Sequence, residues 1–210
     1  MARRRLAHDE RSAAILRVAR ELFSRRPYSA VPVGDLAEAA GVSPALILFY
    51  FGSKKALYLE VLRTAITALA EGLDAVPGPP SLARLRASAR FYAEQALTHR
   101  TGYLSLLRSG GDPSLPEAVE LVEGYRETIV AKILADVAAD VPPLDDATRL
   151  LLGIGIRGYL GFVDAAIVPW LDLPDEQRAL VDPDAIAALA LGAFRGTLTA
   201  VLPALGDPGG

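Results

Sequence analysis

The sequence has no cysteine, and its only two histidines, His8 and His99, lie far apart in the 210-residue chain. The absence of thiols excludes a disulfide scaffold, a thiolate zinc site and a cysteine nucleophile. Two isolated histidines also leave too little material for a metal site or a Ser-His triad. No nucleophile–base or acid–base pair stands out, so we expect neither an enzyme nor a bound cofactor or metal.

Long uncharged segments are scarce as well. The longest, residues 39–53, contains Gly41 and Pro44 and is shorter than the ~18 apolar residues that a membrane span needs. The N-terminal Met-Ala-Arg-Arg-Arg runs into further charged residues without an apolar secretory segment. We therefore expect a cytoplasmic protein that has no membrane partner.

Charge is unevenly distributed along the chain. Residues 1–63 carry 11 Lys and Arg against 6 Asp and Glu, a net charge of +5, whereas residues 64–210 carry 11 against 19, a net charge of −8. The formal charge of −3 for the whole chain conceals this division. A basic head on an acidic body is expected where one end of a protein meets a polyanion, although small domains also vary by this much by chance.

Apolar residues recur at intervals of three and four almost throughout, which predicts an all-α fold without strands. In the first segment Ile15, Leu22 and Phe23 belong to one apolar stripe, and Pro27 ends the helix. Glycines and the proline-rich residues 76–80 mark further boundaries. After the helix that ends near Pro27, we expect helices at about residues 33–40, 44–51, 54–74, 81–99, 102–108, 115–139, 145–171 and 182–202.

A helix, a tight turn and a second helix are predicted over residues 33–51. Ala37 allows the second helix to approach closely, and Gly41 lets the chain turn without strain. Ser43 is a good N-cap, and Pro44 suits a first helical position. This is the helix-turn-helix arrangement, whose second helix can enter the major groove of DNA, although many other helix pairs also turn at a glycine.

Two stretches of this region have a characteristic order and spacing. They are residues 28–43, which include Val33-Gly34-Asp35-Leu36-Ala37-Glu38-Ala39-Ala40-Gly41-Val42-Ser43, and residues 51–58, Phe51-Gly52-Ser53-Lys54-Lys55-Ala56-Leu57-Tyr58. These stretches resemble the DNA-binding domain of the TetR family of transcriptional regulators. The resemblance implies a three-helix DNA-binding domain at residues 1–56. A helical domain for ligand binding and dimerisation would follow at residues 57–205, before a frayed tail at residues 206–210.

The resemblance also implies which residues contact DNA. Residues 44–50 would form the recognition helix, Lys54 would meet a phosphate at a helix N-terminus, and residues 3–5 would form a flexible basic arm. The alternative for Lys54 is an ordinary exposed lysine. The predicted DNA-binding residues are Arg3, Arg4, Arg5, Ser43, Pro44, Ala45, Leu46, Leu48, Phe49, Tyr50, Lys54 and Lys55.

The chain departs from the family's pattern in this region. Val31 and Pro32 stand where the family commonly has a hydroxyl, and Leu48 stands where it usually has a phosphate-contacting tyrosine. The predicted recognition helix contains no Arg, Asn or Gln for reading guanine or adenine. With Ile47 and Phe51 assigned to the core, we hypothesise that contact with thymine methyl groups, together with DNA shape, supplies much of the selectivity. Alternatively, this apolar helix packs against something other than DNA.

Aromatic residues on four predicted helices of the C-terminal part suggest a pocket, and the resemblance implies a small-molecule effector there. From the sequence alone, an aromatic residue of this kind more often belongs to the core than to the wall of a ligand pocket. Arg157 interrupts an apolar helix and, if buried, needs a carboxylate, either Asp164 or an acidic ligand. The candidate ligand-binding residues are Tyr92, Tyr103, Leu107, Arg108, Tyr125, Arg126, Arg157, Phe162 and Trp170.

The last two long helices are rich in small residues. Four glycines within one helix cost about 3–4 kcal/mol relative to alanine, which the close approach of another helix can offset. In the TetR family these two helices form a four-helix dimer interface; packing within one subunit, or a kink, is the alternative. The predicted interface residues are Gly158, Gly161, Ala165, Ala187, Leu191 and Phe194.

Gly153, Gly155 and Gly158 also fit the dinucleotide-binding pattern G-x-G-x-x-G. That motif needs a strand before it and a βαβ unit around it, and the flanks here are helical, so we reject it.

Together these features predict a dimeric, ligand-responsive transcriptional regulator. Its partners would be a second copy of itself, a palindromic operator in double-stranded DNA, and an unidentified small-molecule effector that releases it as a repressor. One alternative is an all-helical carrier or enzyme that does not use its N-terminal helices for DNA. The other is an activator or architectural DNA binder without an effector.

Overall fold

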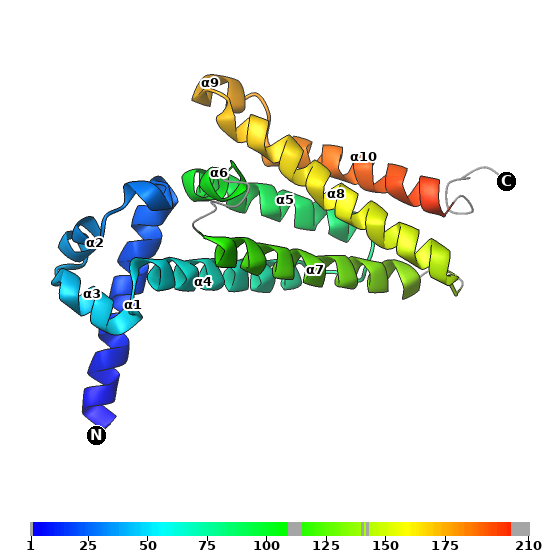
Figure 1. Ribbon diagram of the computed structural model, residues 1–210. Helices are drawn as coiled ribbons and strands as arrows, with labels where there is room; N and C mark the ends of the chain where they lie inside the picture. Colours follow the sequence, from blue (N-terminus) through cyan, green and yellow to red (C-terminus); the bar gives the residue numbers. More distant parts are fainter. Residues whose placement is uncertain (1, 109–114, 140, 142, 203–210) are drawn as a thin grey trace. The chain divides into compact units, whose positions relative to one another are not determined.

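The computed structural model describes residues 2–108, 115–139, 141 and 143–202, so the predicted tail at residues 206–210 lies outside the described residues. Every regular element over the described residues is helical, which confirms the all-α class (Figure 1). The elements are α1 (Ala2–Arg25), η1 (Tyr28–Ala30), α2 (Val33–Ala40), α3 (Pro44–Phe51), α4 (Lys54–Asp74), α5 (Leu82–Thr98), α6 (Arg100–Arg108), α7 (Pro116–Ala139), α8 (Asp146–Asp172), α9 (Asp175–Arg178) and α10 (Pro183–Val201).

The chain forms two compact units. Unit 1 comprises residues 1–68 and 99–121, and unit 2 comprises residues 69–98 and 122–210. Two helices therefore belong partly to each unit: α4 passes from unit 1 to unit 2 after Ala68, and α7 does so after Leu121.

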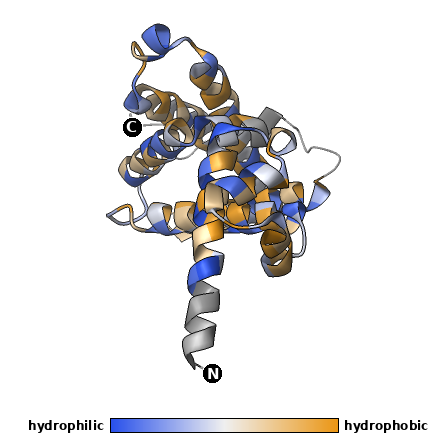
Figure 2. Ribbon diagram, turned by 90° about the vertical axis from the view of Figure 1, so that its left-hand side faces the viewer, coloured by the Kyte–Doolittle hydropathy of each residue, from blue (hydrophilic) through white to orange (hydrophobic). Residues whose placement is uncertain are grey.

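The core of unit 1 collects buried apolar side chains from α1, α2, α3, α4 and the start of α7. In α1 they form a stripe of Ile15, Ala19 and Phe23, all almost fully buried. Figure 2, in which α1 begins at the N label, shows hydrophilic and hydrophobic residues alternating along its described part. The stripe meets buried side chains from the other elements of the unit, among them Val31, Leu36, Ala37, Ile47, Leu57, Tyr58, Leu115 and Ala118.

Unit 2 is built around α5, α8 and α10, which pack against one another. The buried side of α8 repeats at helical spacing and consists of Leu152, Gly153, Ile156, Tyr159, Val163, Ile167, Trp170 and Leu171. A Cβ at Gly155 would lie 2.6 Å from the Thr197 methyl carbon of α10, so this glycine permits the close approach of the two helices. The three glycines of the rejected dinucleotide pattern all lie inside α8.

Both α8 and α10 are long and apolar enough, by length and composition, to cross a membrane. Neither helix is an unbroken uncharged run, since Arg157 and Asp164 lie in α8 and Arg195 lies in α10. Within unit 2, only 33% of the most apolar 18-residue segment of α8 and 22% of that of α10 are buried. Much of the apolar surface of these two helices therefore lies outside the core of the unit.

Candidate nucleic-acid interface

The helices α2 and α3 meet at an angle of 100° across a short turn. At the end of α2 Gly41 adopts the left-handed conformation, with φ of 63°. Its amide donates to the Glu38 carbonyl at 3.1 Å, and the Val42 amide donates to the Ala37 carbonyl at 2.9 Å. Ala37 is 2% exposed, as the close contact between the helices requires. The helices α2 and α3, joined at this angle by a short turn, form a helix-turn-helix.

Caps define both ends of α3. The Ser43 hydroxyl accepts a hydrogen bond from the Leu46 amide at 3.2 Å, and Pro44 occupies the first helical position. At the other end Gly52 takes φ of 76°, which leaves the chain free to turn into α4. The Ser53 hydroxyl then accepts from the Ala56 amide at 3.0 Å and caps α4. The predicted recognition helix is therefore a separate two-turn rod.

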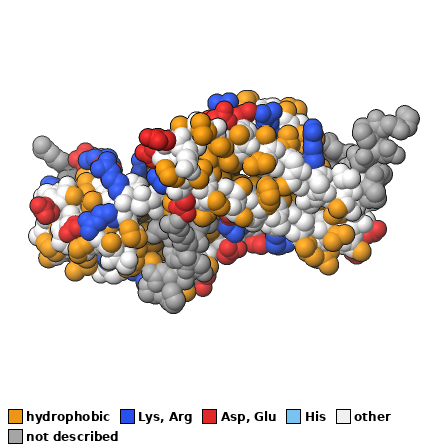
Figure 3. Space-filling model, turned by 90° about the horizontal axis from the view of Figure 1, so that it is seen from above, with side chains coloured by type: hydrophobic (Ala, Val, Ile, Leu, Met, Phe, Trp, Pro, Cys, Tyr) orange, Lys and Arg blue, Asp and Glu red, His pale blue; other side chains and the backbone are white. Residues whose placement is uncertain are grey.

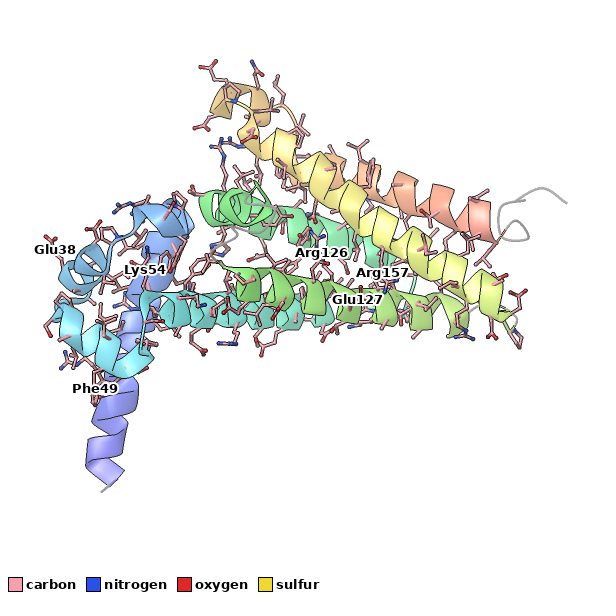
Figure 4. The ribbon with its side chains drawn as sticks, viewed as in Figure 1. Glu38, Phe49, Lys54, Arg126, Glu127 and Arg157 are labelled. Carbon is pink, nitrogen blue, oxygen red and sulfur yellow. The ribbon has the colours of Figure 1, made fainter. Side chains whose placement is uncertain are left out.

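The faces of α3 divide largely as the sequence predicted. Ile47 is fully buried, and Phe51 is half-buried against the same core. Leu48 and Phe49 are 44% and 74% exposed, so Phe49 is among the most exposed large apolar side chains of the described part (Figure 4). Of the other predicted contact residues, Ser43, Pro44 and Ala45 are exposed, whereas Leu46 and Tyr50 are half-buried.

Lys54 is the first residue of α4, and its Nζ lies 4.1 Å from the centre of the Tyr28 ring. Partial burial lowers the pKa of its ammonium group. No ion pair to Lys54 is found among the residues that the structure describes. Tyr28 itself packs on Phe23 and Tyr58. The sequence indicates no role for Tyr28 beyond its place in the stretch that resembles the TetR family, because it lies 26 positions from Lys54.

Lys55, one of the predicted DNA-binding residues, pairs with a carboxylate within unit 1. Its Nζ donates to Oε1 of Glu117 at 2.6 Å, and this interaction lowers the pKa of that carboxyl group. Glu117 lies in the first turn of α7, in unit 1, and its Oε2 is a buried oxygen without a hydrogen-bond partner among the described atoms. Sequence spacing did not indicate this pair, because the two residues are 62 positions apart.

The N-terminal segment is helical, which corrects the prediction of a flexible arm. α1 begins at Ala2, so Arg3, Arg4 and Arg5 lie in its first turns rather than in an extended segment. The reason is local: neither proline nor glycine occurs between Ala2 and Arg25, and nothing interrupts the helix. The side chains of the three arginines lie outside the described part.

The candidate ligand-binding residues do not form one group. Trp170 is buried and donates from its indole nitrogen to the Val181 carbonyl at 2.8 Å, which makes it part of the core. Phe162 is 41% exposed. Three of the candidates, Tyr103, Leu107 and Arg108, belong to unit 1, whereas the others belong to unit 2. The side chains of Leu107 and Arg108 lie outside the described residues.

Three helices of unit 2 do share one polar cluster. Asp164 of α8, with a side chain only 14% exposed, accepts from the Tyr92 hydroxyl of α5 at 2.9 Å and pairs with Arg126 of α7. Arg126 also lies 3.6 Å from Glu123. Nearby in sequence, burial and the negative charge of Asp74 raise the pKa of Tyr125 to about 12. Tyr92 and Arg126 are the two candidates that the structure brings together.

We expected Asp164 or an acidic ligand as the partner of Arg157 if this residue were buried. It is exposed instead. Its guanidinium pairs with Glu127 of α7, with Nε 2.9 Å from Oε1, and the pair lowers the pKa of Glu127 (Figure 4). Both side chains are about half exposed. Asp164 is seven residues along α8 and is held by Arg126 instead.

The predicted dimer residues separate into two groups. Gly158, Gly161 and Ala165 are exposed on α8, beside further apolar side chains. On α10, Ala187 and Phe194 are buried within the unit, where Phe194 lies 5.1 Å from the Tyr159 ring; they cannot meet a second subunit. Leu191 is half-buried. The two buried residues follow the same stripe as Ile186 and Ala190, which packs inward.

One face of unit 2 remains apolar. Figure 3 shows hydrophobic side chains spread over the region of α8 and α10, with charged side chains mainly around its edges. We call the exposed apolar stripes of these helices the α8–α10 face. On α8 it contains Leu151, Ile154, Gly158, Gly161, Phe162 and Ala165, and on α10 it contains Ala188, Leu189 and Gly192.

Fold and site together define a helix-turn-helix DNA-binding protein with a second, helical unit. The family described as "Bacterial regulatory proteins, tetR family" matches residues 15–61. The transcriptional regulator EthR of Mycolicibacterium smegmatis is 31% identical over 160 residues, which cover 69% of this chain and 71% of that protein. The transcriptional activator FasR of the same organism is 39% identical over 69 residues, 33% of this chain and 32% of its own.

A solved structure extends the similarity over both units. The crystal structure of a tetR-family transcriptional regulator from Streptomyces coelicolor has a TM-score of 0.79 and 25% identity, and covers 93% of this chain and 83% of its own. The chain belongs to the TetR family of bacterial regulatory proteins. It is a DNA-binding transcriptional regulator, and the relatives named above are transcriptional regulators rather than enzymes.

Proposed function

We propose that the protein is a dimeric repressor whose two copies of α3 enter successive major grooves of a palindromic operator. The observation that carries this proposal is the outward face of α3 after a 100° turn, in which Gly41 ends α2 and Ser43 caps α3. Lys54 would bind a phosphate at the N-terminus of α4, where unpaired amides also favour an anion. Residues 1–56 would act as the DNA-binding domain and residues 57–205 as the regulatory domain.

A second copy of the chain is the proposed occupant of the α8–α10 face. Large contiguous apolar surfaces are rare on monomers, and this one lies on the two helices that the family resemblance assigned to dimerisation. Gly158, Gly161 and Ala165 lack bulky side chains, which would let a partner helix approach closely. A two-fold axis through this face would present two identical recognition helices, as a palindromic operator requires.

Unit 2 is the proposed site of effector binding. Its polar cluster of Tyr92, Arg126 and Asp164 connects three helices, so a ligand group that replaced one of these contacts would change how the helices are held. α4 and α7 each continue from unit 2 into unit 1, which offers a covalent path for such a change. A coupling free energy of about 1–3 kcal/mol is enough to alter DNA affinity by about 5- to 150-fold.

Titration of DNA at two salt concentrations tests the proposal. Phosphate contacts make affinity fall steeply with salt, so a DNA-binding dimer should bind duplex tightly at low salt and more weakly at high salt. The complex should contain two protein chains per operator. A ligand carrier that does not use its N-terminal helices would show neither affinity nor salt dependence, and that result would reject the proposal.

A further inference from the structure

The outward face of α3 is apolar along its whole length. Ala45, Leu48 and Phe49 share one side of the helix at spacings of three and four, and all three are exposed. Phe49 is 74% exposed, and the neighbouring Tyr50 ring lies 5.6 Å from it at an angle of 88°. This edge-to-face contact restricts the Phe49 ring, so a large and partly ordered apolar side chain stands at the most exposed point of the helix.

The residue types of α3 limit how it can read a base pair. Bidentate reading of guanine or adenine needs Arg, Lys, Asn or Gln, and residues 44–51 contain none of these. Tyr50 carries the only polar side chain of α3 and is half-buried. The major-groove edges of the four base pairs offer one apolar group, the C5 methyl of thymine. The exposed apolar side chains of α3 are therefore complementary to the methyl group of thymine.

Charge favours DNA over a protein partner as the occupant of this face. Residues 1–63 carry a net charge of +5, whereas the remaining residues carry −8. Lys54 lies on the same unit as α3 and has no ion-pair partner among the described residues. Positive charge around α3 attracts a polyanion to this helix, whereas it would not favour binding to an uncharged groove of a protein partner.

We propose that Phe49, supported by Leu48, is the specificity-determining residue of the operator contact and reads the C5 methyl group of thymine. This inference rests on the proposed function, because it requires α3 to lie in the major groove. It assigns the operator a chemical feature: each half-site carries at least one thymine whose methyl contacts Phe49. The same contact would accept 5-methylcytosine, which carries a methyl at the same ring position.

Deoxyuridine substitution isolates this contact, because uracil differs from thymine only by the methyl. Starting from a duplex selected out of random DNA, each thymine is replaced in turn, and the Kd of the full-length protein is measured by fluorescence anisotropy. Burial of one methyl corresponds to about a fourfold change in affinity, so loss of the methyl in both half-sites should weaken binding about 15-fold. A duplex with 5-methylcytosine at the contacted position should bind more tightly than one with cytosine.

Phe49→Ala should bind the thymine and uracil duplexes equally. Its fold should persist, because Phe49 contributes little to the core, and circular dichroism checks this. Leu180→Ala, which removes an apolar side chain that is 84% exposed in unit 2, is the matched control and should keep the discrimination.

Three results would overturn the assignment. Tight, selective binding that is unaffected by every uracil substitution would reject the methyl contact, whereas the proposed function as a DNA-binding regulator would stand. Uracil discrimination that persists in Phe49→Ala would move the contact to another residue. The absence of any selective duplex binding by the wild-type protein would reject the proposed function and this inference together.

Discussion

Replacement of Lys54 by glutamine is the sharpest test of how α4 contributes to the interface. Lys54→Gln removes the positive charge and keeps a polar side chain of similar length. The contact with the Tyr28 ring at 4.1 Å contributes about 0.5–1 kcal/mol to stability if it resembles exposed cation–π pairs. Its loss is too small to unfold a domain, so a change in DNA binding reports on the DNA contact.

The size of the effect follows from counterion release. Each phosphate that a lysine neutralises contributes about 0.9 to the slope of log K against log salt, so two copies of Lys54 in a dimer contribute about 1.8. Between ~50 and ~200 mM salt, a fourfold increase, the wild-type protein should lose about 12-fold more affinity than Lys54→Gln. The assay is an anisotropy titration of the selected operator at several salt concentrations.

Lys132→Gln provides the matched control. Lys132 pairs with Asp74 in unit 2, whereas the helix-turn-helix belongs to unit 1, so its removal should leave the salt slope unchanged. If Lys54→Gln retains the full wild-type slope, Lys54 does not contact a phosphate, and its position over Tyr28 is only structural.

Three further predictions concern assembly, the turn and pH. Ile154→Glu should convert the dimer to a monomer by placing a charge on the α8–α10 face, as measured by light scattering, whereas Leu180→Glu should leave the dimer intact. Gly41→Ala should lower the free energy of unfolding by about 1–2 kcal/mol, because φ is +63°, whereas Gly34→Ala within α2 should raise it by about 0.4–1 kcal/mol in denaturant titrations. Burial raises the pKa of Tyr159 from 10.0 to about 12, so its stabilising contribution is present below pH 10 and is lost as the pH rises through 12. The wild-type protein should thereby lose about 2–3 kcal/mol over that range, and Tyr159→Phe should lose correspondingly less.

Each of these predictions has an outcome that contradicts it. A dimeric Ile154→Glu would place the interface elsewhere on the protein. Equal effects of the two glycine substitutions would mean that backbone conformation does not distinguish them, since neither added Cβ has a neighbour within 4 Å. A Tyr159→Phe variant with the same alkaline stability profile as the wild type would assign the loss to other groups, such as Tyr125.

Helix ends were predictable because local chemistry determines them. Gly41 and Gly52 end helices in conformations that other residues avoid, and the hydroxyl of Ser43 caps the next helix, so the ends of α2 and α3 follow from the sequence. The inward position of Ile47 follows from helical spacing in the same way. The four-residue α9 was not predicted, since so short a helix carries no periodic signal.

Long-range partners were not predictable from the sequence. The pairing of Arg157 with Glu127 depends on how α7 and α8 lie against each other, which a pattern within α8 does not reveal. Small residues such as Ala187 suit both a dimer interface and a tight core, and only the packing of α10 within unit 2 shows that it is buried. The same applies to Glu117, which holds Lys55 from 62 positions away.

Selection of preferred duplexes from random DNA tests the central claim most directly. If two copies of α3 lie in successive major grooves, the enriched sequences should form an inverted repeat whose half-sites are centred one helical turn, about 34–36 Å, or a multiple of it apart. Enrichment of a single unsymmetrical site, or no enrichment above random sequence, would contradict the account.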